Sequence, residues 1–193
     1  MRQVTRVDPF HSGIDIEANY NLPLGFGLFS EDSRLEFNTY QTWTRDFTVT
    51  PVQAFPNLTN ECVGSFGQTC GQPIPEWKGS TRITWRSGPV GLSLRHRYIG
   101  KTTVDTYVLP SRRAGATPPP LDSLTNPVID TQHYFDLTAN VRPAEKLDIN
   151  FGVRNLFNRY APIVGSPSPA ANTFAATYDV EGQVFFMGAS LKF

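Results

Sequence analysis

The stretch that decides the fold is Leu147-Asp148-Ile149-Asn150-Phe151-Gly152-Val153-Arg154. Its odd-numbered residues are apolar, and its even-numbered residues are polar or small. A period of two places alternate side chains on opposite faces of a β-strand. The stretch therefore predicts a strand with one apolar face and one polar face.

The same alternation recurs on both sides of this stretch. It is regular in residues 14–21, 134–141 and 185–193, and less regular in about 34–49, 76–86 and 90–104. His96 falls on the apolar side of its segment, where it breaks the pattern. No segment keeps a helical period. We predict an all-β fold of about seven strands.

The connections between these strands alternate between short and long. Short turns lie at 22–25, 87–89 and 143–146, and long Pro- and Gly-rich loops lie at 51–75, 105–130 and 157–177. If each connection reverses the chain, all the short turns lie at one end of an antiparallel, up-and-down sheet and all the long loops at the other. Outer-membrane barrels have this asymmetry.

Large aromatic residues mark the ends of the predicted apolar faces. Trp77 and Trp85 are eight residues apart, Phe185 and Phe193 repeat that spacing, and Trp43 lies at a similar position. Eight tilted residues span roughly 20 Å along a membrane normal, close to the apolar band of a transmembrane barrel. Strands also recur about every 28 residues, against 8–12 in soluble sandwiches. We predict a transmembrane β-barrel segment with Trp43, Trp77, Trp85 and Phe193 in its aromatic girdles.

Composition excludes several classes of function. Lysine and arginine number 17, as do aspartate and glutamate, so no basic excess points to nucleic acid as a partner. No apolar run is long enough for a transmembrane helix. The three histidines lack metal-ligand spacing, and no Gly-x-Ser-x-Gly elbow is present. We expect no metal, no cofactor and no enzymatic activity.

The two cysteines, Cys62 and Cys70, lie close together in a Gly-rich stretch of the first long loop. An even number of neighbouring cysteines most simply predicts one disulfide, and hence an oxidising compartment. Two unpaired thiols or a metal site remain the alternatives.

The end of the chain resembles a known family. Gly152-Val153-Arg154-Asn155-Leu156-Phe157-Asn158-Arg159-Tyr160, Asn172-Thr173-Phe174, Tyr178-Asp179 and the terminal Lys192-Phe193 resemble the end of TonB-dependent outer-membrane receptors. Residues 13–17, 75–78 and 97–100 resemble earlier parts of the same barrel. The family implies a 22-stranded barrel filled by a plug. It implies import of a scarce solute, such as an iron–siderophore complex, cobalamin or a glycan, with energy supplied through TonB.

By this resemblance, residues 1–193 form the C-terminal third of such a barrel, an open curved sheet without plug, TonB box or signal peptide. The implied partners are outer-membrane lipid, the remaining barrel and plug, the TonB complex, the barrel-assembly machinery and a small-molecule solute, all at the bacterial outer membrane. The last strand would carry the assembly signal in Phe185, Met187, Ala189, Leu191 and Phe193. The rival hypotheses are a small passive pore or structural barrel, and a soluble all-β binding module.

Solute selection is expected in the external loops, which expose aromatic and basic side chains. The candidates are Phe55, Phe66, Tyr107, Arg112, Arg113, Phe174 and Tyr178. The predicted strands also turn charged residues to the polar face, where we expect opposite charges to pair across strands in a hydrated wall. These are Asp15, Glu17, Arg34, Glu36, Lys78, Arg82, Arg95, Arg97, Asp136, Asp148 and Arg154.

Overall fold

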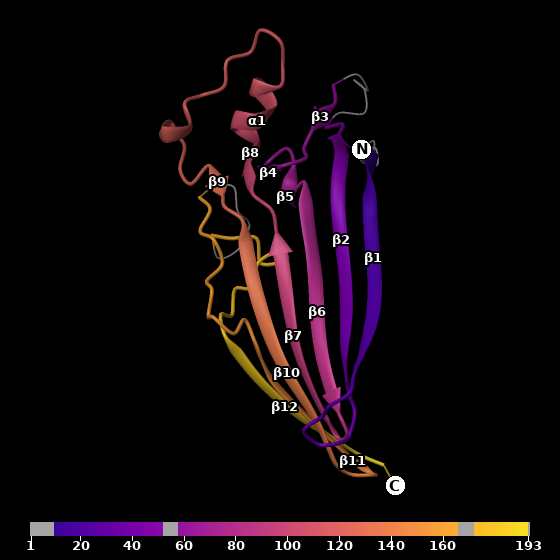
Figure 1. The fold of residues 1–193 in the computed structure, drawn as a ribbon. Helices are drawn as coiled ribbons and strands as arrows, with labels where there is room; N and C mark the ends of the chain where they lie inside the picture. The colour runs from indigo at the N-terminus through magenta and orange to yellow at the C-terminus, as the bar shows by residue number, and fades with distance from the viewer. Residues whose placement is uncertain (1–9, 52–57, 166–171, 193) are drawn as a thin grey trace, which may run out of the picture.

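The computed structural model describes residues 10–51, 58–165 and 172–192. Its main element is a curved antiparallel sheet (Figure 1). Seven long strands follow one another in chain order: β1 (Phe10–Leu24), β2 (Ser33–Val49), β6 (Trp77–Ser87), β7 (Val90–Ile99), β10 (Gln132–Ala144), β11 (Leu147–Arg154) and β12 (Val184–Leu191). This confirms the predicted all-β, up-and-down sheet of seven strands.

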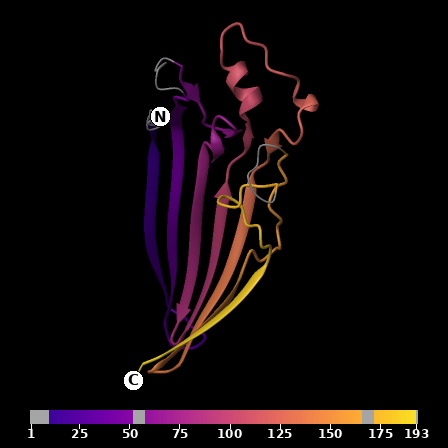
Figure 2. The same ribbon diagram turned by 180° about the vertical axis from the view of Figure 1, so that it is seen from behind.

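The sheet is open. β1 forms one edge and β12 the other, and within the described residues these two strands do not pair with each other. The three short turns lie at one end of the sheet and the long connections at the other (Figures 1 and 2). We call these the turn end and the loop end.

The long connections fold into a structure of their own, which we call the cap: residues 58–76, 100–131 and the described parts of 155–183. It contains a second sheet in the order β5-β4-β8-β9. Its elements are β3 (Asn60–Glu61, paired with β2), β4 (Ser65–Gly67), β5 (Gly71–Ile74), β8 (Thr102–Val104), α1 (Asp105–Ser111), η1 (Leu121–Ser123) and β9 (Val128–Ile129). In the described part of the chain, no helix is long and apolar enough to cross a membrane.

The strand register separates the main sheet into two faces. Cross-strand partners share a face, so one row can be followed across all seven strands. An example is Tyr20–Phe37–Ile83–Leu94–Leu137–Val153–Phe185. We call this the apolar face. Its side chains are unusually exposed for their type, with Phe185 at 72% and Met187 at 76%.

The predicted facing is confirmed for the described residues. Phe135, Leu137, Ala139, Leu147, Ile149, Phe151 and Leu191 all lie on the apolar face by register. Phe193 lies outside the described residues. The opposite face carries all eleven charged residues predicted for it, and we call it the charged face.

Two predicted boundaries are wrong. The first turn is residues 25–32 rather than 22–25, because Leu22, Pro23 and Leu24 continue pairing with Leu35, Arg34 and Ser33. Proline is tolerated there because β1 is an edge strand with one unpaired side. The segment predicted as a strand over 90–104 breaks after Ile99, and Thr102–Val104 joins the cap sheet instead.

The buried apolar core of the described residues lies in the cap rather than under the sheet. It gathers side chains from all three long connections and from one strand of the main sheet. These are Phe66, Val104, Ile129, Tyr134, Val164, Phe174 and Tyr178. No other described segment covers the apolar face of the sheet in a comparable way.

Candidate functional site

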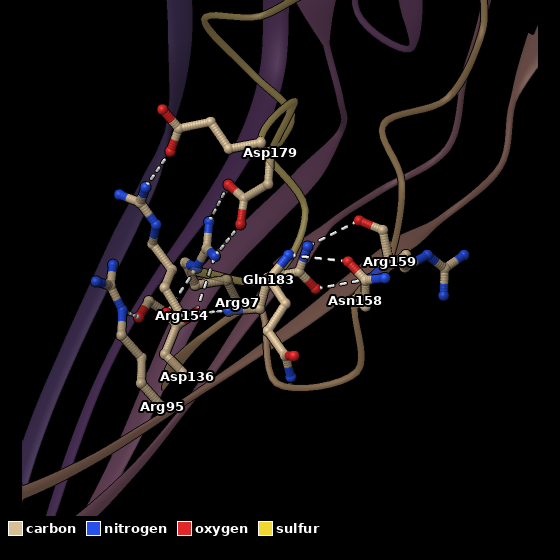
Figure 3. A network of polar contacts seen from close by, with 11 residues as sticks. Arg95, Arg97, Asp136, Arg154, Asn158, Arg159, Asp179 and Gln183 are labelled. Atoms are coloured by element: carbon tan, nitrogen blue, oxygen red, sulfur yellow. Dashed lines mark hydrogen bonds and ion pairs between the residues drawn. The ribbon is translucent and has the colours of Figure 1, made fainter. Parts of the chain in front are cut away.

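The candidate site lies where the charged face meets the cap, around Arg97 of β7 (Figure 3). The Arg97 guanidinium donates to both carboxylate oxygens of Asp136 on β10, at 3.0 and 3.1 Å. It also donates to both carboxylate oxygens of Asp179 in the β11–β12 connection. A guanidinium shared by two bidentate carboxylates is a strong, geometrically specific contact. Arg97 therefore fastens the cap to the sheet.

The turn after β11 completes this attachment. Asn155 adopts a left-handed backbone conformation (φ 54°), which asparagine tolerates better than most residues. Its buried amide group accepts from the Arg159 backbone N–H and donates to the Arg159 carbonyl, at 2.9 and 2.8 Å. Its own backbone N–H donates to Asp136. Asn158 in turn accepts from the Gln183 N–H, just before β12. This motif, residues 152–160, resembles the receptor family. Its hydrogen bonds thus connect the end of β11 with β10 and with the start of β12. We call this connection the joint.

Below this joint, towards the turn end, the charged face carries cations without carboxylate partners. Arg82 and Arg95 are direct cross-strand neighbours. Arg95 donates to the Ser80 hydroxyl at 2.9 Å, and neither guanidinium forms an ion pair within the described chain. Lys78 lies nearer the loop end on the same strand as Arg82. The predicted pairing of opposite charges across strands holds for Glu36 with Arg86, Arg97 with Asp136 and Asp148 with Arg142. Arg34 pairs with Glu36 on its own strand, and Lys78, Arg82 and Arg95 form no ion pair among the described residues.

This arrangement can bind polar or anionic groups that reach the charged face. Adjacent guanidinium groups offer several N–H donors and positive charge, which the nearby carboxylates of Asp136 and Asp179 partly offset at Arg95. Asp136 is the cross-strand partner of Arg95, but its oxygens are taken by Arg97 and the Asn155 N–H. The wall therefore combines a fixed network of one guanidinium and two carboxylates beneath the cap with two arginines beside it that form no ion pair among the described residues.

The cysteine pair forms the predicted disulfide. The Cα atoms of Cys62 and Cys70 are 5.4 Å apart, and the bridge closes the loop that carries β4. The buried Asp105 carboxylate at the start of α1 accepts from the backbone N–H groups of Thr69 and Cys70, at 2.7 and 3.0 Å. Gly67 (φ 146°) lies against this carboxylate, where a Cβ would collide with it. The bridge and Asp105 hold the same loop.

Three of the predicted solute-contact residues are buried, which corrects that prediction. Phe66, Phe174 and Tyr178 are 1%, 3% and 2% exposed and belong to the cap core. Large aromatic side chains in loops lower their free energy by packing together, and Phe66 and Phe174 meet edge to face with centroids 5.6 Å apart. Burial also raises the pKa of Tyr178 to about 12.

The remaining candidates have cap contacts of their own. Arg112 is exposed, yet it donates to the backbone carbonyls of Glu61 and Val63 at 2.6 and 2.8 Å. Arg113 donates to the Asn60 side chain, and Tyr107 packs half-buried against the cap core. Phe55 lies outside the described residues. The two arginines join α1 to the disulfide loop, a role that their position in a polar loop did not indicate.

The described girdle and assembly-signal residues lie on the apolar face, while Phe193, which belongs to both sets, lies outside the described residues. Trp43 and Trp77 pair at the loop end of the apolar face, and Trp85 pairs with Leu35 nearer the turn end. Phe185, Met187, Ala189 and Leu191 occupy the apolar face of β12, at the open edge of the sheet. Their roles towards lipid and the assembly machinery stay predictions.

One pair of titratable residues was missed by the sequence reasoning. His96 on β7 and His133 on β10 lie 37 positions apart in the chain, and the structure brings their ring nitrogens to 3.0 Å. Only the register reveals this, because the two residues are diagonal neighbours on the apolar face. No group of three or more metal-ligating side chains is found among residues 10–51, 58–165 and 172–192.

Comparison with known proteins identifies the fold. No protein-family model and no curated protein matches the chain. Among solved structures, the chain is similar to a mutant of the ferric enterobactin receptor of Pseudomonas aeruginosa. The TM-score is 0.55 and the sequence identity 15%, over 95% of this chain. The chain spans 22% of that receptor's length. At this identity the likeness shows a common fold.

Proposed function

We propose that this chain is part of the barrel of an outer-membrane receptor that imports a scarce solute with energy coupled through TonB. Three observations support the proposal. The sheet has an apolar and a charged face, its long connections gather at one end, and its fold is similar to that of an outer-membrane receptor.

The exposed apolar face carries the argument. Large apolar side chains are 37–76% exposed in most rows of this face, for example Leu22, Leu92 and Met187. Water-soluble proteins rarely leave so large a contiguous apolar surface uncovered. Lipid chains would cover it, and the charged face would then line the interior of the barrel.

A membrane position also requires more strands than this sheet has. In hydrocarbon every backbone N–H and C=O must be paired, so a transmembrane sheet has to close on itself. The exposed edges of β1 and β12 would therefore pair with further strands. We infer that the chain supplies the C-terminal third of a 22-stranded barrel, whose other strands and plug lie elsewhere in the same receptor.

The solute is proposed to pass along the charged face. The neighbouring structure is a ferric enterobactin receptor, which makes an iron–siderophore complex the first solute class to test, before cobalamin and glycans. Arg82 and Arg95 would suit such a solute if it bears anionic or hydroxyl groups, because their guanidinium groups have no carboxylate partner in the described wall.

Deletion of the gene in its own bacterium tests the proposal. We expect slower growth when iron supplied as a siderophore complex is limiting, loss of uptake of the labelled complex, and rescue by the wild-type gene. Cobalamin and a glycan are tested in parallel. Normal uptake of all three solute classes in the deletion strain would refute import as the function.

A proton uncoupler separates this proposal from its rival, the passive pore. TonB-coupled import stops when the proton gradient collapses, whereas diffusion through a passive pore continues. Unchanged initial uptake after addition of the uncoupler would therefore favour the pore.

A further inference from the structure

The apolar face contains two rows that are not apolar. Towards the loop end they read Ala18–Thr39–Thr81–His96–Phe135 and Ile16–Gln41–Gly79–Tyr98–His133. They lie between the Trp43–Trp77 pair and the apolar rows nearer the turn end. We call Thr39, Gln41, Thr81, His96 and His133 the polar patch. A polar group that faces hydrocarbon without a hydrogen-bond partner is strongly unfavourable, so the presence of this patch calls for a physical explanation.

Most of the patch satisfies its own hydrogen bonds. The hydroxyl oxygens of Thr39 and Thr81 lie 2.9 Å apart, and the Gln41 amide donates to the Thr39 hydroxyl at 2.9 Å. The Gln41 amide oxygen accepts from the Trp77 indole N–H at 3.0 Å. Gly79 leaves the space into which the Gln41 side chain folds. This half of the patch is therefore complete without a ligand.

The histidine pair is not complete in this way. The His96 and His133 rings are nearly parallel (7°), with centroids 5.2 Å apart and Nε2 and Nδ1 3.0 Å apart. The distance between the ring centroids is about the distance between the two nitrogens plus one ring radius at each end. The rings therefore lie side by side, edge to edge, and share one proton between these nitrogens. Phe135 stacks on His96 and Tyr98 packs against His133, which fixes both rings.

The two outer ring nitrogens, Nδ1 of His96 and Nε2 of His133, have no hydrogen-bond partner in the described chain. In the neutral pair, whichever ring donates the shared proton, one outer nitrogen is a donor and the other an acceptor. If the pair gains one proton, both outer nitrogens become donors. The extra proton therefore makes Nδ1 of His96 a donor in every tautomer, which suits an anionic oxygen beside that ring.

The surroundings of the pair define the chemistry of its occupant. Gln41, Trp77, Gly79, Thr81, His96 and Tyr98 line a hollow of about 330 Å³. Ile83, Leu94 and Leu137 continue the surface towards the turn end. An occupant must therefore present a polar group at the hollow and apolar chains below it.

We propose that the polar patch binds the phosphate-bearing headgroup of a lipid, whose acyl chains lie along the apolar rows below. This rests on the proposed membrane position of the sheet. The hollow accommodates the headgroup, and Nδ1 of His96, which lines the hollow, donates to a phosphate oxygen, while His133 holds the other nitrogen of that ring.

Protonation of the pair should strengthen this binding. Imidazole takes up a proton between about pH 5 and pH 8. On the apolar face the other titratable neighbour is Tyr98, while β6 presents Thr81 and Gly79, and β10 presents Phe135. The nearest charged groups, Arg95, Arg97 and Asp136, belong to the charged face. No carboxylate of the described residues on the apolar face is therefore placed to bind the protonated histidines instead of a phosphate.

Lipid retention tests the proposal in the complete protein that the gene encodes, purified from membranes in detergent. The probes are dioleoyl phosphatidic acid and dioleoylglycerol, which differ only in the phosphate, measured together by native mass spectrometry at about pH 5.5 and about pH 8. We expect preferential retention of phosphatidic acid, stronger at the lower pH. The His96→Gln/His133→Gln variant should lose that preference at least about five-fold.

His11→Gln is the matched control, because His11 stacks on Phe47 near the end of β1, away from the hollow, and should retain lipid like wild type. If the double variant does not fold, the single variant His96→Gln decides, with an expected loss of about two-fold. Equal retention of both lipids by wild type, or an unchanged preference in the folded variants, would overturn the proposal. A wild-type dimer that the double variant abolishes would also overturn it, because a second copy would then occupy the patch.

Failure of the proposed function gives a different result. In that case the wild-type protein does not fractionate with the outer membrane. A protein that fractionates there but shows no phosphate preference contradicts only the lipid site.

Discussion

Arg97 is the residue on which the attachment of the cap depends. Its guanidinium group and the two carboxylates it binds are 12–20% exposed, so they are largely withdrawn from solvent. Removing one partner of such a buried group lowers the stability of the fold far more than removing one partner of an exposed ion pair, because the remaining charge stays desolvated without compensation.

Replacement of Asp179 measures this attachment. Asp179→Ala should destabilise the β11–β12 connection by about 1–3 kcal/mol, because Arg97 loses a bidentate acceptor. Faster amide hydrogen exchange in residues 172–183 of the membrane protein is the readout. Glu181→Ala is the matched control, since the Arg154–Glu181 pair is 50% and 65% exposed and should contribute less than about 1 kcal/mol. Equal exchange in the two variants would contradict the assignment.

We predict that the cap loses stability at high pH, where the buried phenol of Tyr178 ionises. Its folded-state pKa is raised from 10.0 to about 12. The stabilising effect is complete below pH 10, where the unfolded chain also keeps its phenol protonated, and is lost as the pH rises through about 12. The change amounts to about 2–3 kcal/mol.

The Tyr178→Phe variant removes this titration. Between about pH 9 and pH 12, its melting temperature should fall less than that of wild type. Tyr160→Phe, at a tyrosine that is 75% exposed in the same connection, should behave like wild type. Identical pH profiles for Tyr178→Phe and wild type would contradict the assigned burial.

At the scale of elements, the disulfide loop and α1 form one unit. Asp105→Ala removes the carboxylate that accepts from the backbone N–H groups of Thr69 and Cys70, and it should cost about 2–3 kcal/mol of cap stability. Cys62→Ser/Cys70→Ser should cost a similar amount through the longer free loop. Because both changes release the same loop, the combined variant should lose less than the sum. If the losses of stability measured by thermal unfolding add fully in the combined variant, the disulfide loop and α1 are not one unit. Asp105→Asn should lose less stability than Asp105→Ala.

The two faces of β11 give a direct test of orientation. A nitroxide at Ile149→Cys should be accessible to oxygen dissolved in lipid, and one at Asn150→Cys to a water-soluble relaxing agent. The reason is the period of two, since a slip of one residue would exchange the faces. The reverse pattern in reconstituted membranes would show that the assigned faces are wrong.

The sequence predicts the long strands well because each carries its signal locally. The period of two in β11 requires no distant partner, and neighbouring strands then follow by alternation of turns and loops. The helix α1 carries no such signal. It has seven residues, includes Pro110, and is too short for a helical period to emerge.

The site was harder to predict because its contacts are distant in the chain. Arg97 and Asp179 are separated by 82 positions, and the register that brings His96 beside His133 exists only once β7 and β10 are paired. The burial of Phe66 and Phe174 has the same origin. A loop position suggests exposure, and only the folded cap shows that the two rings meet.

At the scale of the whole molecule, the open edges determine how the isolated polypeptide behaves. β1 and β12 present unpaired backbone groups beside exposed apolar side chains, a combination that templates pairing with other chains. Residues 1–193 expressed alone should aggregate in buffer and require detergent. Gel filtration with light scattering checks this. A monodisperse monomer that melts cooperatively in plain buffer would contradict the barrel proposal.

The composition of the cap core has a consequence for assembly. Phe66, Ile129 and Tyr178 come from three different connections, and each connection is anchored by a different pair of strands. Their rings and methyl groups can interlock only after β2, β6, β7, β10, β11 and β12 have all reached their final register. A strand displaced by one residue would hold its loop at the wrong height and leave a gap in the cluster. We therefore expect the core of the cap to form, and the connections to resist proteases, only when these strands have reached their final register.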